Sequence, residues 1–327
     1  MRREKSWLVL GILMLSLLGP AAAGAANDVL APGVHLFESR RYEEARKFFE
    51  PYAARNPRDA EAAYYLGKTW FFLRQYERAA EWLEKAAALA PGRSEHHLWL
   101  ARAYGRAAQQ ASLFKQPGLA KKAKAAWDKA LAADPNNLDA RSDLIQYYLQ
   151  APGFMGGSVE KAREQAAEIK KRDAVRGAVA YATIALDQKD AAGAERELKE
   201  AVQKAPADPR PRLTLGALYQ SQEKWDAAFE TFEGLLKAKP DDWDALYQIG
   251  RTGALSGRRL DRAEECLKRY LGHTPGPDSA PLANAHFRLG MVYEKKGNKA
   301  AARAEYQTAL KLDPSLKEAK EALGKLG

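Results

Sequence analysis

The sequence repeats with a step of 34 residues. Pro57 and Pro91 stand 34 residues apart, as do Pro206 and Pro240. Between such prolines, a Leu-Gly pair, an aromatic residue, an alanine and a second large apolar residue recur at fixed distances. Three copies of this pattern are Leu66-Gly67, Trp70, Ala79 and Leu83; Leu215-Gly216, Tyr219, Ala228 and Phe232; and Leu289-Gly290, Tyr293, Ala302 and Tyr306. A repeat of this length buries its apolar face only against adjacent copies, so we expect an elongated array rather than one compact core.

Each recurring position has a physical role in a pair of antiparallel helices. Small residues such as Gly67 and Ala79 allow the two helices to approach closely, and the large apolar residues fill the space between repeats. The recurring proline ends the second helix, because the residue before a proline is pushed out of helical geometry. The turns Asp134-Pro135-Asn136-Asn137 and Lys239-Pro240-Asp241-Asp242 contain side-chain oxygens that are expected to cap the next helix.

These positions resemble the tetratricopeptide-repeat (TPR) pattern W-x2-L-G-x2-Y, A-x3-F, P, and the likeness covers nearly all of the chain after residue 26. The resemblance implies an all-α fold, a right-handed α-solenoid of about eight helix-turn-helix units with a C-terminal capping helix. The units are expected near 26–59, 60–93, 94–137, 138–174, 175–208, 209–242, 243–282 and 283–314, and the capping helix at 315–327. The type of TPR protein that it resembles is a bacterial exported one.

Two stretches depart from the repeat. The third unit carries ten extra residues around 112–119, and the fourth has the loop Ala151-Pro152-Gly153-Phe154-Met155-Gly156-Gly157-Ser158 between its helices. The loop lacks the Gly-Lys-Ser/Thr ending of a phosphate-binding loop and follows a helix rather than a strand. We therefore expect a flexible connector with Ser158 as the N-cap of the next helix.

Residues 1–26 have the layout of a secretory signal. Arg2, Arg3 and Lys5 precede an uncharged apolar run, and Ala23-x-Ala25 is a plausible cleavage site. This predicts a periplasmic or secreted protein with no stable membrane insertion after cleavage. The alternative is an uncleaved anchor in the inner membrane, since Trp7 to Ala26 is long enough to span a bilayer.

Residues suited to catalysis or metal binding are sparse. Five histidines are present, and none has a partner at metal-ligand spacing on one helix face. The single cysteine, Cys266, lies in an expected helix and is interpreted as a small buried apolar residue. The sequence predicts no enzyme, with no catalytic residue, no cofactor and no metal site.

The candidate binding surface follows from the TPR resemblance. In that family, positions 2, 5, 6, 9, 12 and 13 of each repeat point into a concave groove. Carried over to this chain, they give a main aromatic and cationic cluster on the second and third units and a weaker set on the last two. The candidates are Tyr64, Tyr65, Lys68, Phe72, Trp99, Arg102 and Arg106 in the main cluster, and Tyr247, Arg251 and Arg288 in the weaker set. Aromatic residues and arginine dominate binding energy at interfaces.

The chain after residue 26 has 49 Lys and Arg against 41 Asp and Glu, a net charge of +8. Basic and acidic residues balance at the groove positions, so the excess is expected on outer runs such as Lys121-Lys122 and Lys170-Lys171-Arg172. A nucleic-acid partner does not suit an exported chain.

The main functional hypothesis is therefore a non-catalytic scaffold of the bacterial cell envelope that holds a peptide or protein partner, itself an envelope component, in the groove. Two alternatives stay open. One is self-assembly through repeat faces, with a homo-oligomer as its product. The other is binding of anionic envelope glycans through the basic outer runs.

Overall fold

The computed structural model describes residues 29–275 and 279–326, and within them it contains seventeen α-helices, one short 3-10 turn and no strand. The predicted signal segment 1–26 lies outside the described residues. The chain divides at residue 238 into two units, which are described separately. The first unit holds α1 (Ala31–Glu38), α2 (Tyr42–Arg55), α3 (Ala60–Phe72), α4 (Tyr76–Leu89), α5 (Ser94–Gln110), α6 (Gln116–Ala133), α7 (Leu138–Gln150), the 3-10 turn η1 (Gly153–Met155), α8 (Val159–Arg172), α9 (Ala174–Asp187), α10 (Ala191–Lys204), α11 (Pro209–Ser221) and α12 (Trp225–Ala238). The second holds α13 (Trp243–Ser256), α14 (Leu260–Leu271), α15 (Leu282–Lys295), α16 (Lys299–Leu312) and α17 (Lys317–Lys325).

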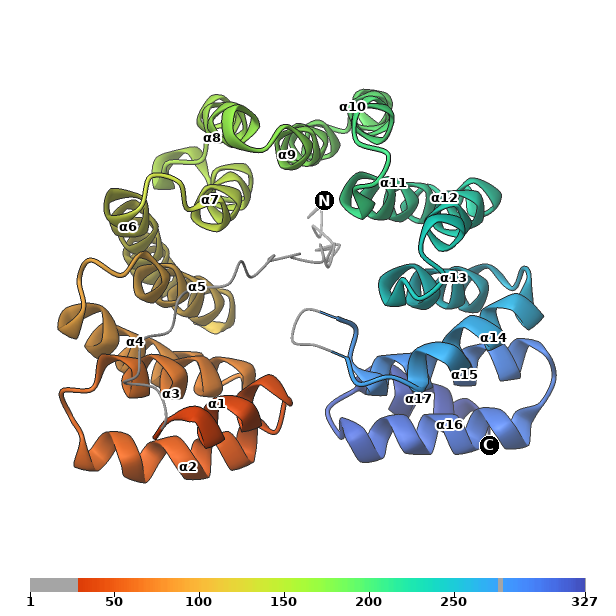
Figure 1. Cartoon of the computed structure of the whole chain (residues 1–327), viewed down its shortest axis with the longest axis horizontal. Coiled ribbons are helices and arrows are strands. Elements are labelled where there is room, and N and C mark those ends of the chain that lie inside the picture. Colours follow the sequence, from red (N-terminus) through yellow and green to blue (C-terminus); the bar gives the residue numbers. More distant parts are fainter. Residues whose placement is uncertain (1–28, 276–278, 327) are drawn as a thin grey trace. The chain divides into compact units, whose positions relative to one another are not determined.

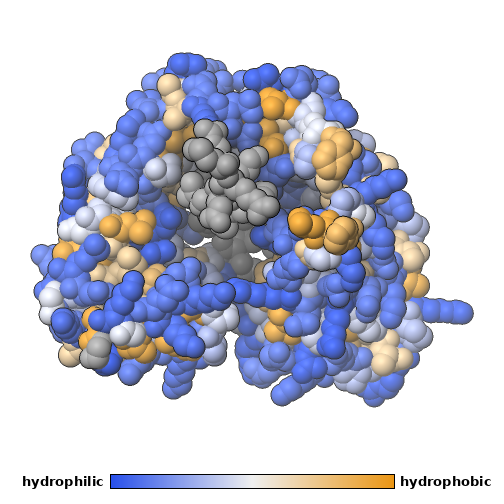
Figure 2. All heavy atoms as spheres, turned by 180° about the vertical axis from the view of Figure 1, so that it is seen from behind, coloured by the Kyte–Doolittle hydropathy of each residue, from blue (hydrophilic) through white to orange (hydrophobic). Residues whose placement is uncertain are grey.

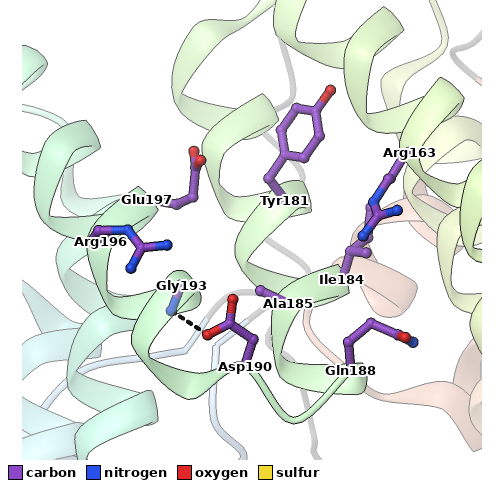
Figure 3. A pocket seen from close by; sticks show the side chains of 9 residues that line it. All are labelled: Arg163, Tyr181, Ile184, Ala185, Gln188, Asp190, Gly193, Arg196 and Glu197. Carbon is purple, nitrogen blue, oxygen red and sulfur yellow. Dashed lines mark hydrogen bonds between the residues drawn. The ribbon is translucent and has the colours of Figure 1, made fainter.

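Helix ends follow the recurring prolines, as predicted. Helices α2, α4, α6, α10, α12 and α16 each end two residues before the proline of their repeat. The predicted N-caps are also confirmed: the Asn137 side chain accepts a hydrogen bond from the backbone N–H of Ala140 at 2.9 Å, and Asp242 accepts one from Ala245 at 3.0 Å. Asp190 caps α10 in the same way through Gly193 (Figure 3).

Within the first unit, consecutive helices pack as antiparallel pairs, and a second set of contacts joins odd-numbered helices. Helix α1 contacts α3, α3 contacts α5, α7 contacts α9, and α9 contacts α11. The odd-numbered helices therefore line one side of this unit and the even-numbered helices the other (Figure 1). Fully buried side chains such as Phe49, Leu83 and Leu144 belong to the continuous apolar core of this unit. The surface drawn in Figure 2 is mostly hydrophilic, with apolar side chains in small separate patches.

The second unit repeats this arrangement on a smaller scale. Helix α13 packs on α14, α15 on α16, and α13 also contacts α15. Its core includes the buried side chains of Tyr270, Leu289 and Tyr306, and the single cysteine, Cys266, is buried as predicted. Helix α17 packs on α16 through Ala319 and leaves exposed lysine and glutamate side chains on its outer face. The prediction of an all-α solenoid of stacked helix pairs is confirmed.

The Leu-Gly pair of the repeat marks the point where the two helices of a pair meet most closely. A Cβ atom at Gly216 would lie 2.3 Å from Cε1 of Phe232, and a Cβ atom at Gly290 would lie 2.4 Å from Cε1 of Tyr306. Phe232 and Tyr306 are completely buried at the matching position of the second helix. The glycine is thus the space into which the large residue of the partner helix fits.

The two departures from the repeat have distinct structures. Helices α5 and α6 have 17 and 18 residues, whereas α3 and α4 have 13 and 14, so most of the extra length of the third unit extends its helix pair. The loop 151–158 is not the flexible connector that the sequence suggested. Its backbone folds back on itself through hydrogen bonds from Met155 and Gly157 to the carbonyl oxygen of Pro152, and the hydroxyl of Tyr147 donates to the carbonyl oxygen of Met155. Ser158 caps α8, as predicted.

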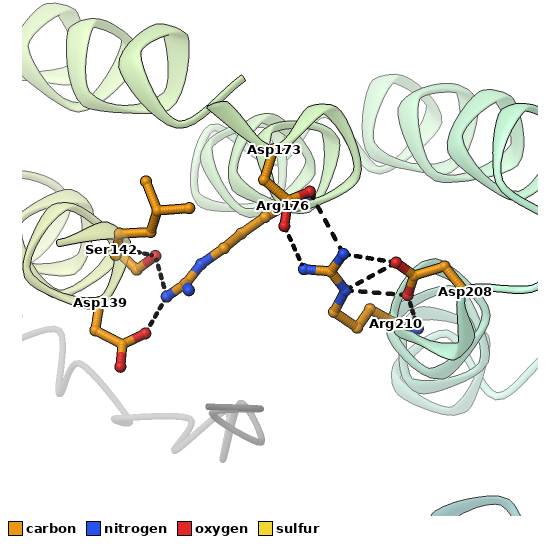
Figure 4. A network of polar contacts seen from close by, with 7 residues as sticks. Asp139, Ser142, Asp173, Arg176, Asp208 and Arg210 are labelled. Atoms are coloured by element: carbon orange, nitrogen blue, oxygen red, sulfur yellow. Dashed lines mark hydrogen bonds and ion pairs between the residues drawn. The ribbon is translucent and has the colours of Figure 1, made fainter. Parts of the chain in front are cut away.

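Arginine-aspartate pairs connect successive helix pairs along the odd-numbered helices of the first unit (Figure 4). Arg176 on α9 reaches back to Asp139 and Ser142 on α7. Arg210 on α11 donates to Asp173, at the start of α9, at 2.6 Å and to Asp208 at 2.6 Å. Because the pairs Arg176–Asp139 and Arg210–Asp173 each join neighbouring repeats, they help to fix the stagger between helix pairs.

Arg210 also changes the titration of its partners. Burial opposes ionisation of Asp173 and of Asp208, but hydrogen bonds from Arg210 and from backbone N–H groups outweigh it and hold the pKa of both carboxyls below the ordinary value of 3.8. A lowered folded-state pKa stabilises the fold above the ordinary carboxyl pKa, and this stabilisation is lost as the pH falls through the folded-state value.

We predict that Gly216→Ala lowers the free energy of unfolding by about 1–3 kcal/mol, because the added methyl group has no room beside the Phe232 ring. The matched control is Gly234→Ala on α12, where a Cβ atom would meet nothing within 4 Å. There the better helix propensity of alanine should stabilise the chain by up to about 1 kcal/mol. Urea unfolding, monitored by circular dichroism, gives the free energy of unfolding of both variants. Equal effects of the two substitutions would contradict the close approach at Gly216.

We predict that Arg210→Met lowers the thermal unfolding temperature near neutral pH and that this loss shrinks in acid. As the pH falls from the ordinary carboxyl pKa toward the lower folded-state pKa values of Asp173 and Asp208, wild type progressively loses the contribution that the variant already lacks. Melting curves by circular dichroism between about pH 7 and about pH 3 test this. Replacement of the exposed Arg196 by Met should give a difference that changes little with pH. A loss in Arg210→Met that is constant over the whole range would refute the prediction.

Candidate functional site

The main candidate cluster lies on α3 and α5 of the first unit. Five half-buried residues form a surface that we call the aromatic face: Tyr65, Lys68, Phe71, Phe72 and Trp99. Phe71 and Phe72 both meet the Trp99 ring, with centroids 5.3 Å and 5.7 Å apart. The rings are therefore held by one another while part of each remains accessible.

Lys68 is surrounded by aromatic rings. Its Nζ atom lies 4.8–5.3 Å from the ring centroids of Phe37, Tyr64, Tyr65 and Trp99. The negative faces of aromatic rings attract a cation at this distance, so the four rings hold the ammonium group in place. The aromatic face therefore combines a positive charge held in one position with a large area for apolar contact.

Helix packing explains why these residues meet. Phe37 on α1 contacts both Tyr65 and Phe72, and Tyr42 on α2 stacks on Phe72 with centroids 4.8 Å apart. Phe37 stands 34 residues before Phe71, at the same position of the preceding repeat. Phe37 occupies a groove position of the first unit. The groove rule that gave the candidates on the second and third units therefore identifies Phe37 when it is applied to the first unit.

Two predicted contact residues, Tyr64 and Arg102, interact with other residues inside the protein. Tyr64 is buried, 8% exposed, and burial raises the pKa of its hydroxyl well above the ordinary value. The guanidinium of Arg102 donates to Asp143 at 2.7 Å, in a pair whose side chains are 14% and 4% exposed. Trp127 Nε1 also donates to Asp143. These residues contribute to packing and to the connection between α5 and α7, and the structure does not offer Tyr64 as a contact surface.

Arg106 differs from Arg102. It is exposed on α5, and its guanidinium donates to the side chain of the neighbouring Gln109 at 3.0 Å. Arg106 therefore presents a positive charge on the same helix as Trp99, two turns further along.

The weaker set lies in the second unit. Tyr247 is buried against Tyr270, so its ring is a packing residue rather than a contact surface. Arg251 and Arg288 are half-buried, and burial together with the nearby charge of Arg288 lowers the pKa of Arg251. Arg288 lies over the Phe287 ring and donates to the Met291 sulfur. The set belongs to a different unit from the aromatic face and is considered by itself.

The described residues contain no group of three or more His, Cys, Asp or Glu side chains that could hold a metal ion. His96 and His97 are buried and bond backbone carbonyl oxygens of Ala86 and Pro91. The pocket of Figure 3 lies against α8, α9 and α10 and has a volume of about 180 Å³. Small-molecule sites usually enclose about 300–1,000 Å³. A second pocket is lined by Trp70, flanked by Arg46 and Arg78, and Arg46 is already paired with Glu43 and Glu50.

None of the helices in the described ranges combines the length and the apolar character needed to cross a bilayer.

Sequence comparison places the repeats in a known family. Three models of the tetratricopeptide repeat match residues 30–94, 185–251 and 283–316. A 242-residue stretch, 70% of the chain, is 31% identical to cellulose synthase operon protein C of Xanthomonas axonopodis pv. citri and covers 15% of that protein. A 113-residue stretch, 34% of the chain, is 31% identical to human protein O-mannosyl-transferase TMTC1 and covers 12% of it. The chain thus spans less than a sixth of either relative.

Structure comparison agrees on the fold. The crystal structure of yeast Tom70 superposes with a TM-score of 0.67 over 96% of this chain and 66% of that one, at 15% sequence identity. At this identity the likeness concerns the fold alone. Membership of the family supports a protein-binding scaffold in general terms, because TPR stacks typically bind proteins and carry no catalytic site. The recurring Leu-Gly and proline positions, the stacked helix pairs and the three matches lead to one conclusion: the chain belongs to the tetratricopeptide-repeat family.

Proposed function

We propose that this protein is a non-catalytic scaffold of the bacterial cell envelope that holds a segment of another protein against the aromatic face. The observation that carries the proposal is the Lys68 ammonium group held by four rings, next to the half-exposed side chains of Phe72 and Trp99. Half-exposed rings offer a large contact area at a small cost in side-chain entropy. Aromatic residues are for this reason enriched in binding hot spots.

The charges of the aromatic face suggest the chemistry of its partner. Asp143 pairs with Arg102, and Lys68 is enclosed by the rings with Glu95 nearby, whereas Arg106 is exposed on α5. A segment that places an apolar side chain on the rings and a carboxylate near Arg106 would satisfy both features.

The envelope location rests on the sequence of residues 1–26 and draws support from the similarity to a protein named for a bacterial cellulose synthase operon. We propose a periplasmic or secreted protein after signal cleavage. Retention in the inner membrane through residues 1–26 is the alternative, and mass spectrometry of the N-terminus of protein from fractionated cells distinguishes the two.

A second candidate function is binding of an anionic envelope glycan. The exposed Lys170 and Lys171 in the last turn of α8 favour it. Salt-sensitive retention on immobilised anionic polysaccharide, lost when both lysines are replaced by serine, would support this function. Retention that is absent or unaffected by the replacement would remove it.

We predict that a photo-crosslinking amino acid at position 72 captures a protein partner in intact cells, whereas the same amino acid at position 82 captures none of it. Trp82 is the matched control because it is a half-buried aromatic residue on α4, an even-numbered helix on the other side of the first unit. Sequencing of the captured segment should show an apolar residue close to an acidic one. Equal capture at both positions would argue against the aromatic face.

The captured segment then allows an affinity test. Trp99→Ala should weaken its binding about tenfold or more, as expected for an aromatic hot spot, while Trp82→Ala should leave the affinity unchanged. Calorimetric titration gives both values, and circular dichroism confirms that each variant keeps its helices. Unchanged affinity in a folded Trp99→Ala protein would exclude the aromatic face as the binding site.

A further inference from the structure

The two departures from the 34-residue repeat lie at one edge of the first unit. Each connects the first helix of a pair to the second: residues 111–115 join α5 to α6, and residues 151–158 join α7 to α8. In a stack of antiparallel helix pairs, all connections of this kind lie at the same edge. Helix α6, which begins where the first connection ends, also contacts η1 within the second connection. We call the two departures together the insert edge.

The insert edge exposes the large apolar side chains that are most accessible among the described residues. Phe114 is 97% exposed, Phe154 86% and Leu113 80%. The next, Val29, is 63% exposed and lies outside the edge. Exposed large apolar side chains gathered at one place on a folded surface mark a site of contact with a partner or a membrane.

The edge presents these side chains from ordered backbone. The loop that carries Phe154 is closed by hydrogen bonds to the Pro152 carbonyl oxygen and by the Tyr147 hydroxyl. Gly156 adopts a φ of +94°, and a Cβ atom at Gly157 would lie 1.8 Å from the carbonyl oxygen of Ala151, so both positions require glycine. A loop closed so tightly could cover an apolar ring, yet it leaves Phe154 in solvent.

Along the chain, the charges next to Leu113 and Phe114 are basic, and the nearest recorded acidic neighbour from another helix is Glu84 of α4, 3.9 Å from Lys122. No Asp or Glu occurs between His96 and Trp127, a stretch that includes the exposed Lys115 and Lys121. The loop 151–158 carries no charged residue, and the first acidic residue after it is Glu160, in the first turn of α8. Apolar tips with lysines beside them complement a surface that is apolar inside and anionic at its boundary.

A lipid surface fits these observations better than a protein partner does. The three apolar side chains stand at the tips of two connections rather than lining a packed groove, and insertion into a bilayer needs no matching shape. The lysines can extend their aliphatic stems along the lipid boundary and keep their ammonium groups at the phosphates.

We propose that the insert edge docks the protein on an anionic membrane surface, with Leu113, Phe114 and Phe154 inserted at the level of the lipid headgroups and Lys115 and Lys121 in contact with lipid phosphates. The docking is peripheral and leaves the aromatic face, which lies on α3 and α5, available to its own partner.

The test places an environment-sensitive fluorophore on the full-length protein at single introduced cysteines, Phe114→Cys and Phe154→Cys. Cys266 is buried and does not compete for the label under native conditions. Leu89→Cys is the matched control, because Leu89 is exposed at the far end of its helix pair. With vesicles of phosphatidylethanolamine and phosphatidylglycerol, we expect emission from positions 114 and 154 to shift to the blue and to be quenched by spin-labelled lipid, with no change at position 89.

Unlabelled variants measure the energetics by vesicle co-sedimentation. Joint replacement of Leu113, Phe114 and Phe154 by serine should weaken binding about tenfold or more, whereas serine at Leu89 and Leu312 should not. Replacement of Lys115 and Lys121 by serine should reduce binding to anionic vesicles and its salt sensitivity, in contrast to the charge-matched pair Lys47 and Lys237. All variants share the same N-terminal segment, so differences among them report the insert edge.

The proposal is overturned if labels at positions 114, 154 and 89 respond alike, or if none of them responds. A response at 114 and 154 that is equally strong with neutral phosphatidylcholine vesicles would refute the role of the lysines. Absence of any response to lipid would leave the insert edge as a surface for a protein partner.

Discussion

The structure depends on one recurring contact, in which the large apolar residue of a second helix fits into the space left by a glycine on the first. Phe232 against Gly216 and Tyr306 against Gly290 are two examples from different units. Because the contact brings the two helix backbones close together, it sets the geometry of each pair and thereby the surface that the next pair meets. Repetition of this contact leaves the odd-numbered helices of the first unit side by side, and their outer positions become available for other tasks.

Those positions are used in two ways. Between α5 and α11, arginine and aspartate side chains pair across repeats, and they contribute to the stack rather than to a partner. On α3 and α5, aromatic rings surround Lys68 and remain partly exposed. A buried arginine with a carboxylate partner has little to offer a ligand, because a ligand would have to replace a bond that already exists. The partly exposed rings therefore separate the aromatic face from the rest of the odd-numbered helices.

The insert edge, in contrast, consists of the places where the repeat is interrupted. A strict repeat buries most of its large apolar residues within and between helix pairs, and the most exposed phenylalanines, Phe114 and Phe154, lie where the repeat is interrupted. The longer helices α5 and α6 and the closed loop after α7 provide such interruptions in successive repeats. The proposed membrane contact at this edge and the proposed protein contact on the aromatic face use different parts of the first unit and share only helix α5.

The fold, the helix ends at the prolines, the capping of helices by the turns at Pro135 and Pro240, and the burial of Cys266 could all be predicted from the repeat pattern. These features depend on local rules and on contacts between adjacent repeats, which a 34-residue period records directly. The burial of Tyr64 and Tyr247, the pairing of Arg102 with Asp143, and the closed loop 151–158 with its exposed Phe154 became apparent from the packing of the helices. A repeat position specifies the direction of a side chain but not the partner it meets, because that partner belongs to the next repeat and varies from one repeat to another.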